Sequence, residues 1–285
     1  EGCDTVIHTA SPFYASSQDD EGRDRLVKPA VDGTTNVLNA CKRHGVKKVV
    51  VTSSTAAIYI SYGAKPAEHV FTEADWSDVD VLTEHKNWYC LSKVLAEKAA
   101  WAIANEEGCP FTLAVMNPCL IIGPMLKGQP HLNTSCSAML KLFFSDKIQQ
   151  ACMHLVDVRD VADAHLNAAK MDANWSGWGK RYLLVGASEL QAEVVEAMRQ
   201  SAQVDDEKKA KLPTELDEEL PPAVAGAPPP AKTLFDTSRS TGEPGEGGLG
   251  LHKYFGLQEM VDTTIESMAA NGYSSMEQYT LHKDG

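Results

Sequence analysis

Residues 46–54 read VKKVVVTSS, and this stretch decides the fold. Three consecutive valines indicate a strand that is buried on both faces, because β-branched residues favour strands and an unbroken apolar run leaves no solvent-facing side. Strands of this kind belong to parallel sheets that helices cover on both sides. The run ends in small hydroxyl residues, so Ser53 and Ser54 are expected at the carboxyl end of the strand.

The segments on either side of this strand alternate between strand and helix patterns. Residues 5–10 (TVIHTA) predict a short buried strand, and residues 28–43 predict a helix with apolar residues at helical spacing. Residues 87–104 predict a second helix, and residues 111–122 (FTLAVMNPCLII) predict a strand that Pro118 interrupts. Strand, helix, strand, helix, strand at this spacing predicts an α/β fold with a parallel sheet and right-handed crossovers.

The composition is that of a soluble globular protein, with 43% hydrophobic and 23% charged residues in a chain of 285. A formal net charge of -13 opposes binding to a phosphate backbone, so no nucleic-acid partner is expected. No apolar run approaches the ~20 residues that cross a bilayer, and no signal peptide is expected. Seven cysteines without a C-x-x-C pair indicate a reduced cytoplasmic protein, and no metal-ligand spacing predicts a metal.

The helix at residues 87–104 carries the candidate chemistry near its start, in WYCLSK (88–93). Tyr89 and Lys93 are four residues apart and therefore lie on one face of the helix. A free tyrosine has a pKa of roughly 10. A nearby ammonium favours the phenolate, so such a tyrosine can exchange a proton closer to neutral pH.

The spacing alone is not specific, because Tyr279 and Lys283 have it too in a polar tail. The alternatives without catalysis are a half-buried tyrosine beside a surface lysine and a Ser54 hydroxyl that caps a turn. Context favours Tyr89, since Ser54 and Asn117 follow buried strands at the carboxyl edge where parallel sheets bind ligands. A serine there can donate a hydrogen bond to a substrate carbonyl oxygen.

Seven stretches in order resemble extended short-chain dehydrogenases/reductases of the NAD-dependent epimerase/dehydratase superfamily, and within them dihydroflavonol 4-reductases and cinnamoyl-CoA reductases. The stretches are GCDTVIHTASPF, LVKPAVDGTTNVLNACKRHGVKKVVVTSS, DWSD, KNWYCLSKVLAEKAAW, MNPCLIIGP, QPHLNTS and HLVDVRDVADAH. Seven ordered blocks are far more specific than a single motif.

The resemblance implies roles for individual residues. Ser54 polarises the substrate carbonyl, Tyr89 donates the proton, and Lys93 holds the nicotinamide ribose and lowers the tyrosine pKa. The implied reaction is hydride transfer from NADPH to a ketone or aldehyde with a phenolic or other hydrophobic body, with NAD(H) left open as the cofactor. The implied cofactor contacts are Thr9, Ala10, Ser11, Tyr89, Lys93, Pro118, Cys119, Leu120, Ile121 and Ser135.

The fold that the resemblance implies is a doubly wound Rossmann-type sheet, with its first strands missing, and a smaller interlocked substrate-binding part. Residues 1–124 are expected in the NAD(P)-binding domain and residues 125–285 mainly in the substrate-binding part. Residues from about 152 to 170 are expected to return to the main sheet. Residues 201–231, charged and then proline-rich, are expected to form a flexible loop. A monomer or a homodimer is expected.

The chain departs from the family at its front. Family members open with a strand and a G-x-x-G-x-x-G loop, which binds the pyrophosphate, ahead of the strand at residues 5–10. The deficit is on the order of 70 residues, about two βαβ-sized units. We therefore expect a sequence fragment or a misassembled gene model, and weak NADPH binding by these 285 residues alone.

Two further departures weaken the assignment to a cinnamoyl-CoA reductase and to a sugar-nucleotide enzyme. Leu91 and Ser92 stand where cinnamoyl-CoA reductases have Tyr-Gly, and Lys86-Asn87-Trp88 precedes the tyrosine where epimerases carry Pro and Ser. A 3β-hydroxysteroid dehydrogenase or a nucleotide-sugar epimerase stays open as an alternative. So does a non-catalytic sensor, scaffold or inactive fragment, although a sensor would not need a proton donor.

Overall fold

The structure is a computed structural model that describes residues 2–13, 20–60, 65–66, 68–129, 131–218 and 232–273. It divides into two compact units. Unit 1 comprises Glu1–Cys119, Ala162–Leu184 and Leu234–Lys253, and unit 2 comprises Leu120–Val161, Val185–Thr233 and Tyr254–Gly285. In the described part of the chain, no helix is both long and apolar enough to cross a membrane.

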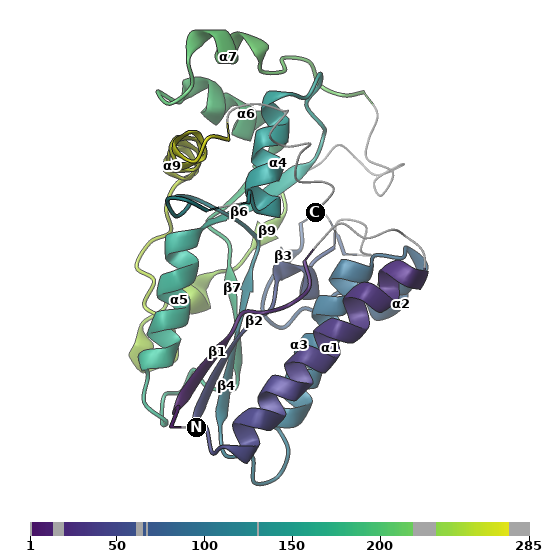
Figure 1. Ribbon diagram of the computed structural model, residues 1–285, viewed down its shortest axis with the longest axis vertical. Coiled ribbons are helices and arrows are strands. Elements are labelled where there is room, and N and C mark those ends of the chain that lie inside the picture. Colours follow the sequence, from purple (N-terminus) through teal and green to yellow (C-terminus); the bar gives the residue numbers. More distant parts are fainter. Residues whose placement is uncertain are drawn as a thin grey trace. The chain divides into compact units, whose positions relative to one another are not determined.

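Unit 1 is built on a parallel sheet whose described strands run in the order β1-β2-β4-β7 (Figure 1). The strands are β1 (Thr5–His8), β2 (Lys48–Thr52), β4 (Thr112–Pro118) and β7 (Lys180–Leu184). Val49 of β2 lies opposite Val6 of β1 on one side and Leu113 of β4 on the other. The parallel α/β fold expected from the sequence is confirmed.

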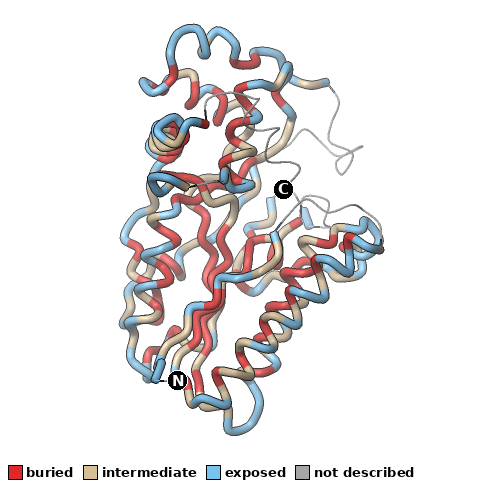
Figure 2. The backbone as a smooth tube through the Cα atoms, in the orientation of Figure 1, coloured by how far each residue is buried: buried red, intermediate tan, exposed pale blue. Residues whose placement is uncertain are grey.

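The two faces of this sheet are covered by different helices, as the alternation of side chains along β2 requires. Val49 and Val51 pack into a buried cluster with residues of α1 (Asp20–Arg43) and α3 (Trp88–Ala104). Thr52 points to the other face, where its hydroxyl lies 2.7 Å from Nε2 of His165 in α5 (Val158–Lys170). Strands β2, β4 and β7 are accordingly buried through most of their length (Figure 2). In β1 only His8 is buried and Ile7 is exposed, so the buried strand expected at residues 5–10 is a partly exposed one.

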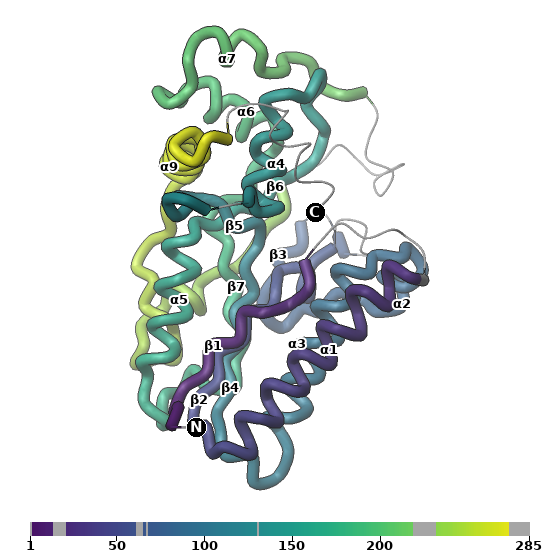
Figure 3. The backbone as a smooth tube through the Cα atoms, in the orientation of Figure 1, coloured from purple at the N-terminus to yellow at the C-terminus, as the bar shows by residue number. Residues whose placement is uncertain are grey.

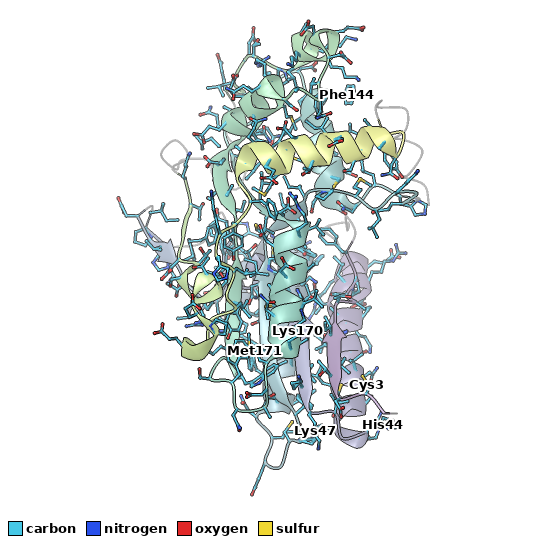
Figure 4. The ribbon with its side chains drawn as sticks, turned by 90° about the vertical axis from the view of Figure 1, so that its left-hand side faces the viewer. Cys3, His44, Lys47, Phe144, Lys170 and Met171 are labelled. Atoms are coloured by element: carbon cyan, nitrogen blue, oxygen red, sulfur yellow. The ribbon has the colours of Figure 1, made fainter. Side chains whose placement is uncertain are left out.

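Lys48 connects the start of β2 to the end of α5 through hydrogen bonds. Its ammonium donates to the carbonyl oxygens of Ala169 at 2.6 Å and Met171 at 3.0 Å. Figure 4 labels Met171 where α5 ends. These bonds satisfy carbonyl groups that the last turn of a helix leaves without intrahelical donors.

Helices α1 and α3 lie side by side on one face of the sheet (Figure 3). The sequence pattern predicted a helix from residue 28, but α1 begins at Asp20. The difference arises at Pro29, which lacks an N–H group and is usually read as a helix start. Here it is accommodated within the helix, which loses one backbone hydrogen bond there.

Unit 2 contains a smaller sheet and several helices. The described strands of this sheet run in the order β5-β6-β8, with β5 parallel and β8 antiparallel to β6. The elements are β5 (Leu120–Ile122), β6 (Cys152–Asp157), β8 (Ala187–Leu190), α4 (Thr134–Phe143), α6 (Gln191–Gln200), α7 (Asp206–Lys211) and α9 (Leu257–Ala270). Apolar side chains of β5, β6, α4, α6 and α9 form one buried cluster, and Ala187 of β8 packs against it.

Two expectations about the second half of the chain need correction. Strand β6 does not join the main sheet, because β7 occupies the edge of β4, with Ala114 opposite Lys180. The return to unit 1 begins instead at Ala162, within α5. In the expected loop 201–231, residues 206–211 form α7, whose Asp205 cap accepts from the Lys208 amide at 2.8 Å. Residues 219–231 lie outside the described residues.

The remaining elements of unit 1 are short. They are β3 (Val70–Phe71), which pairs with β9 (Leu234–Phe235), the helices α2 (Val79–Glu84) and α8 (Ser238–Thr241), and the 3₁₀ turns Thr55–Ala57 and Pro244–Glu246. The first of these turns follows β2 directly and carries the chain out of the sheet at Ser54.

Candidate active site

The first turn of α3 presents Tyr89 and Lys93 on one face of the helix, as their spacing predicted. Asn87 caps the start of the helix, and its side-chain oxygen accepts a hydrogen bond from the Cys90 amide at 3.2 Å. An amide side chain at this position satisfies a backbone donor that the helix leaves unpaired. Lys93 is buried, with 8% of its surface exposed, and its ammonium lies 5.6 Å from the centroid of the Tyr89 ring.

Ser54 lies where β2 ends and forms a hydrogen bond with the Tyr89 hydroxyl. Its own oxygen accepts from the Ala56 amide at 3.1 Å and lies 3.4 Å from the Pro118 carbonyl oxygen. The turn-capping alternative for Ser54 is thus part of its role. The same hydroxyl also meets Tyr89 and the end of β4, so the structure brings Ser54, Tyr89 and Lys93 together.

Burial controls the ionisation of this cluster. It raises the pKa of Tyr89 to about 12, against a smaller lowering by the hydrogen bond from Ser54. It lowers the pKa of Lys93 to about 8. We expected the Lys93 ammonium to lower the tyrosine pKa, but the loss of hydration around the phenol is the larger effect. Tyr89 is therefore held in its protonated form at neutral pH.

The loop after β1 reaches the same place. The Phe13 ring lies 4.9 Å from the Tyr89 ring between centroids, at 54°, and is 45% exposed. Thr9 and Ala10 are exposed, whereas the Ser11 hydroxyl oxygen is buried and has no hydrogen-bond partner among the described residues. A buried hydroxyl of this kind has its hydrogen-bonding capacity free for a ligand.

The predicted cofactor contacts from β4 onward fall in both units. Pro118 ends β4, and Cys119 follows it with its amide donating to the Leu184 carbonyl at 3.2 Å. Both belong to unit 1, with Ser54 and Tyr89. Leu120 and Ile121 lie in β5, and the buried Ser135 lies in α4, all in unit 2. Cofactor contact stays a prediction for these five residues and for Thr9, Ala10, Ser11, Tyr89 and Lys93.

Two functional candidates escaped the sequence analysis. His8, buried at the end of β1, has a pKa lowered by burial and by the positive charge of Lys93, so it belongs to the same cluster. Glu97 is buried on α3 one turn beyond Lys93. The sequence does contain a signal for Glu97. It follows Lys93 by four residues, as Lys93 follows Tyr89, so it is a third ionisable group on the same face of the helix.

Two pockets are lined by other side chains. One of about 290 Å³ in unit 2 is bordered by α4, the segment around α7, and α9. The other, of about 230 Å³, lies beside the amino-terminal end of β1, where Cys3 and His44 line it (Figure 4). Neither is lined by Ser54, Tyr89 or Lys93, so the site is located from its chemistry rather than from a cavity.

Fold and site together define a Rossmann-type protein with a Ser-Tyr-Lys cluster, and comparison with known proteins places it further. The model of the NAD dependent epimerase/dehydratase family matches residues 1–179. The chain belongs to this family. It is 41% identical to cinnamoyl-CoA reductase 1 of Arabidopsis thaliana over 200 residues, which cover 70% of this chain and 54% of that protein. It is 38% identical to the NADPH-dependent methylglyoxal reductase GRE2 of Saccharomyces cerevisiae over 177 residues, which cover 57% and 51%.

Solved structures agree with this placement. Yeast methylglyoxal/isovaleraldehyde reductase Gre2, complexed with NADPH, superposes with a TM-score of 0.75 at 28% identity over 95% of this chain and 78% of that one. Vestitone reductase from alfalfa (Medicago sativa L.) gives a TM-score of 0.69 at 25% identity over 96% and 78%. The chain spans between 54% and 59% of the length of the first two curated relatives.

Proposed function

We propose that this protein is an NADP(H)-dependent reductase that converts a ketone or aldehyde to an alcohol. The observation that carries the proposal is the hydrogen bond between the Ser54 and Tyr89 hydroxyls at the carboxyl edge of a parallel sheet, with the buried Lys93 one helical turn away. The similarity to cinnamoyl-CoA and methylglyoxal reductases supports the same reaction class.

The residues present fit a nicotinamide cofactor. The unpartnered, buried hydroxyl of Ser11 and the partly desolvated ammonium of Lys93 are groups that a ribose or a phosphate could engage. We assign Thr9, Ala10, Ser11, Tyr89, Lys93, Pro118 and Cys119 of unit 1, and Leu120, Ile121 and Ser135 of unit 2, to cofactor contact. When bound, the cofactor supplies the hydride.

Each catalytic side chain then has a separate task. Ser54 donates a hydrogen bond to the carbonyl oxygen and stabilises the negative charge that develops on it. Tyr89, held protonated by burial, delivers its proton to the same oxygen. Lys93 places a positive charge beside the phenol as the proton leaves, and at neutral pH its pKa of about 8 keeps it largely charged.

The substrate that we propose has a phenolic or other hydrophobic body, as in the relatives that act on cinnamoyl-CoA. A 3β-hydroxysteroid dehydrogenase or a nucleotide-sugar epimerase remains the alternative within the fold. A non-catalytic scaffold would not require the protonated Tyr89 next to Ser54. We further propose a cytoplasmic location, because all seven cysteines are free thiols. A monomer or a homodimer stays part of the proposal.

The test is an assay of nucleotide oxidation at 340 nm with the protein expressed from its complete reading frame. NADPH and NADH are each combined with a cinnamoyl-CoA, a cinnamaldehyde, methylglyoxal, a 3-ketosteroid and a UDP-sugar. We expect NADPH-dependent reduction of at least one of the first three. Turnover of the UDP-sugar alone would favour the epimerase alternative, and no turnover with bound NADPH would favour the non-catalytic one.

A further inference from the structure

Glu97 is a buried charge that the mechanism above does not use. Its side chain is fully buried, and it occupies the same face of α3 as Tyr89 and Lys93, eight and four residues before it. A carboxylate taken out of water is unfavourable unless it is paired and hydrogen-bonded. Its partners therefore show what the charge is for.

The carboxylate binds the ends of two neighbouring strands. Its Oε2 atom accepts from the Ser53 hydroxyl at 2.5 Å and from the Asn117 amide nitrogen at 2.8 Å. The same Asn117 nitrogen donates to the backbone oxygen of Ser54 at 3.1 Å. Glu97 thus reaches the catalytic serine by two routes, through its chain neighbour and through the end of β4.

The other side of the carboxylate is fixed by a buried arginine. Arg181 donates from Nε to Oε1 of Glu97 at 2.5 Å and from Nη2 to Oε2 of Glu97 at 3.4 Å. Its first terminal nitrogen donates to the backbone oxygens of Glu73 at 2.9 Å and Asp75 at 2.6 Å, and the guanidinium lies 3.8 Å from the centroid of the Trp76 ring. Both oxygens of Glu97 are held in one place, with their charge compensated.

We propose that Glu97 is a positioning residue that sets the place of the Ser54 hydroxyl relative to the Tyr89 hydroxyl. Tyr89 is carried by α3, whereas Ser54 is carried by the turn after β2. Glu97 joins these two elements directly. The proposal rests on the proposed function for its kinetic consequence, since a displacement of about 1 Å at a reacting centre can cost roughly 10²-fold in rate.

The kinetic test compares Glu97→Gln with Glu73→Gln. Glu73 is a matched control, because it is buried and its backbone oxygen accepts from Arg181 at 2.9 Å. Its carboxylate instead accepts from the Leu183 amide at 3.1 Å. We expect Glu97→Gln to lower kcat about 10- to 100-fold, with KM for NADPH changed less than about twofold. Glu73→Gln should destabilise the protein while kcat stays within about twofold. Equal falls of kcat in both variants would overturn the proposal.

A double-mutant cycle separates positioning from general damage. If Glu97 acts through Ser54, Glu97→Gln should lower kcat by less than about twofold further in a Ser54→Ala background. A full additional fall there would reject the proposal. If Glu97→Gln does not fold, Ser53→Ala removes one donor to the carboxylate with little change of volume, and should give a smaller, several-fold loss of kcat with the same dependence on Ser54. An unchanged kcat in Ser53→Ala would then count against the proposal.

A measurement that does not depend on turnover tests the positioning role of Glu97 separately from the proposed reductase activity. With 3-fluorotyrosine at position 89, the ¹⁹F resonance reports the hydrogen bond from Ser54. We expect Glu97→Gln, or Ser53→Ala where Glu97→Gln does not fold, to move this resonance in the direction of the Ser54→Ala shift, and Glu73→Gln to leave it in place. A shift in a protein that reduces no carbonyl would retain the positioning role and reject the reductase. An unmoved resonance would reject the positioning role.

Discussion

Removing one oxygen atom at Tyr89 should separate catalysis from folding. In Tyr89→Phe the ring keeps its volume and its contact with Phe13, whose centroid is 4.9 Å away. The hydrogen bond with Ser54 is lost, which costs about 0.5–1.5 kcal/mol, and Ser54 keeps the Pro118 carbonyl within 3.4 Å. The loss of a positioned proton donor costs a factor of about 10²–10⁴ in rate, or about 2.7–5.4 kcal/mol in the barrier.

The assay follows from the difference between these two magnitudes. NADPH oxidation at 340 nm should fall at least about a hundredfold, while the dissociation constant for NADPH stays within about threefold and the unfolding midpoint moves by a few degrees. Tyr182→Phe is the matched control. The Tyr182 hydroxyl is buried and donates to the Gly177 and Gly247 carbonyls at 2.9 and 2.8 Å.

The control should show the opposite pattern. Tyr182→Phe leaves two buried carbonyl oxygens without that donor, which costs about 1–3 kcal/mol of stability, yet turnover by the folded protein should be unchanged. Tyr279→Phe tests the other Y-x-x-x-K spacing, which lies outside the described residues, and should change neither quantity. Wild-type turnover in Tyr89→Phe would refute the catalytic assignment and favour a non-catalytic protein.

Three further outcomes follow from the same geometry. The free energy of unfolding without nucleotide should rise as the pH increases from about 8 towards 10. The folded pKa of Lys93 lies below its unfolded value, so in this pH range the unfolded chain binds more protons than the folded one. Lys93→Met should remove this rise in urea titrations. Ser54→Ala should lower kcat by roughly 10²-fold, as removal of one oxyanion donor does, with nucleotide affinity retained. Gly177→Ala should destabilise the protein by about 1–3 kcal/mol in the same titrations, because the added carbon would overlap Trp175 and Tyr182.

The sequence predicts well what depends on neighbours along the chain. The valine run at residues 46–54 gave β2, the apolar periodicity at residues 87–104 gave α3, and the pairing of Tyr89 with Lys93 needed only the helical repeat. The carboxyl ends of parallel strands lie at one edge of the sheet, so the sequence also places Ser54 near Tyr89. These inferences use local periodicity and one rule of topology.

The sequence does not predict what depends on distant partners. The pattern from residue 152 onward predicts a return to the main sheet, but in the structure β7 pairs with β4, and β6 pairs with β5 and β8. The direction of the Tyr89 pKa shift was also misjudged, because helical spacing reveals the lysine and conceals the depth of burial. Burial is a property of the packed unit and not of a short motif.

Glu97 shows most clearly how a local motif and a distant partner combine. Four residues separate it from Lys93, so an unbound carboxylate there would pair with the lysine and raise its pKa. In the structure, burial lowers the pKa of Lys93, and the carboxylate of Glu97 is bound by Arg181, 84 residues away in the chain. A buried carboxylate needs a paired and hydrogen-bonded environment, and for Glu97 that environment comes from a residue outside the helix that carries Tyr89 and Lys93.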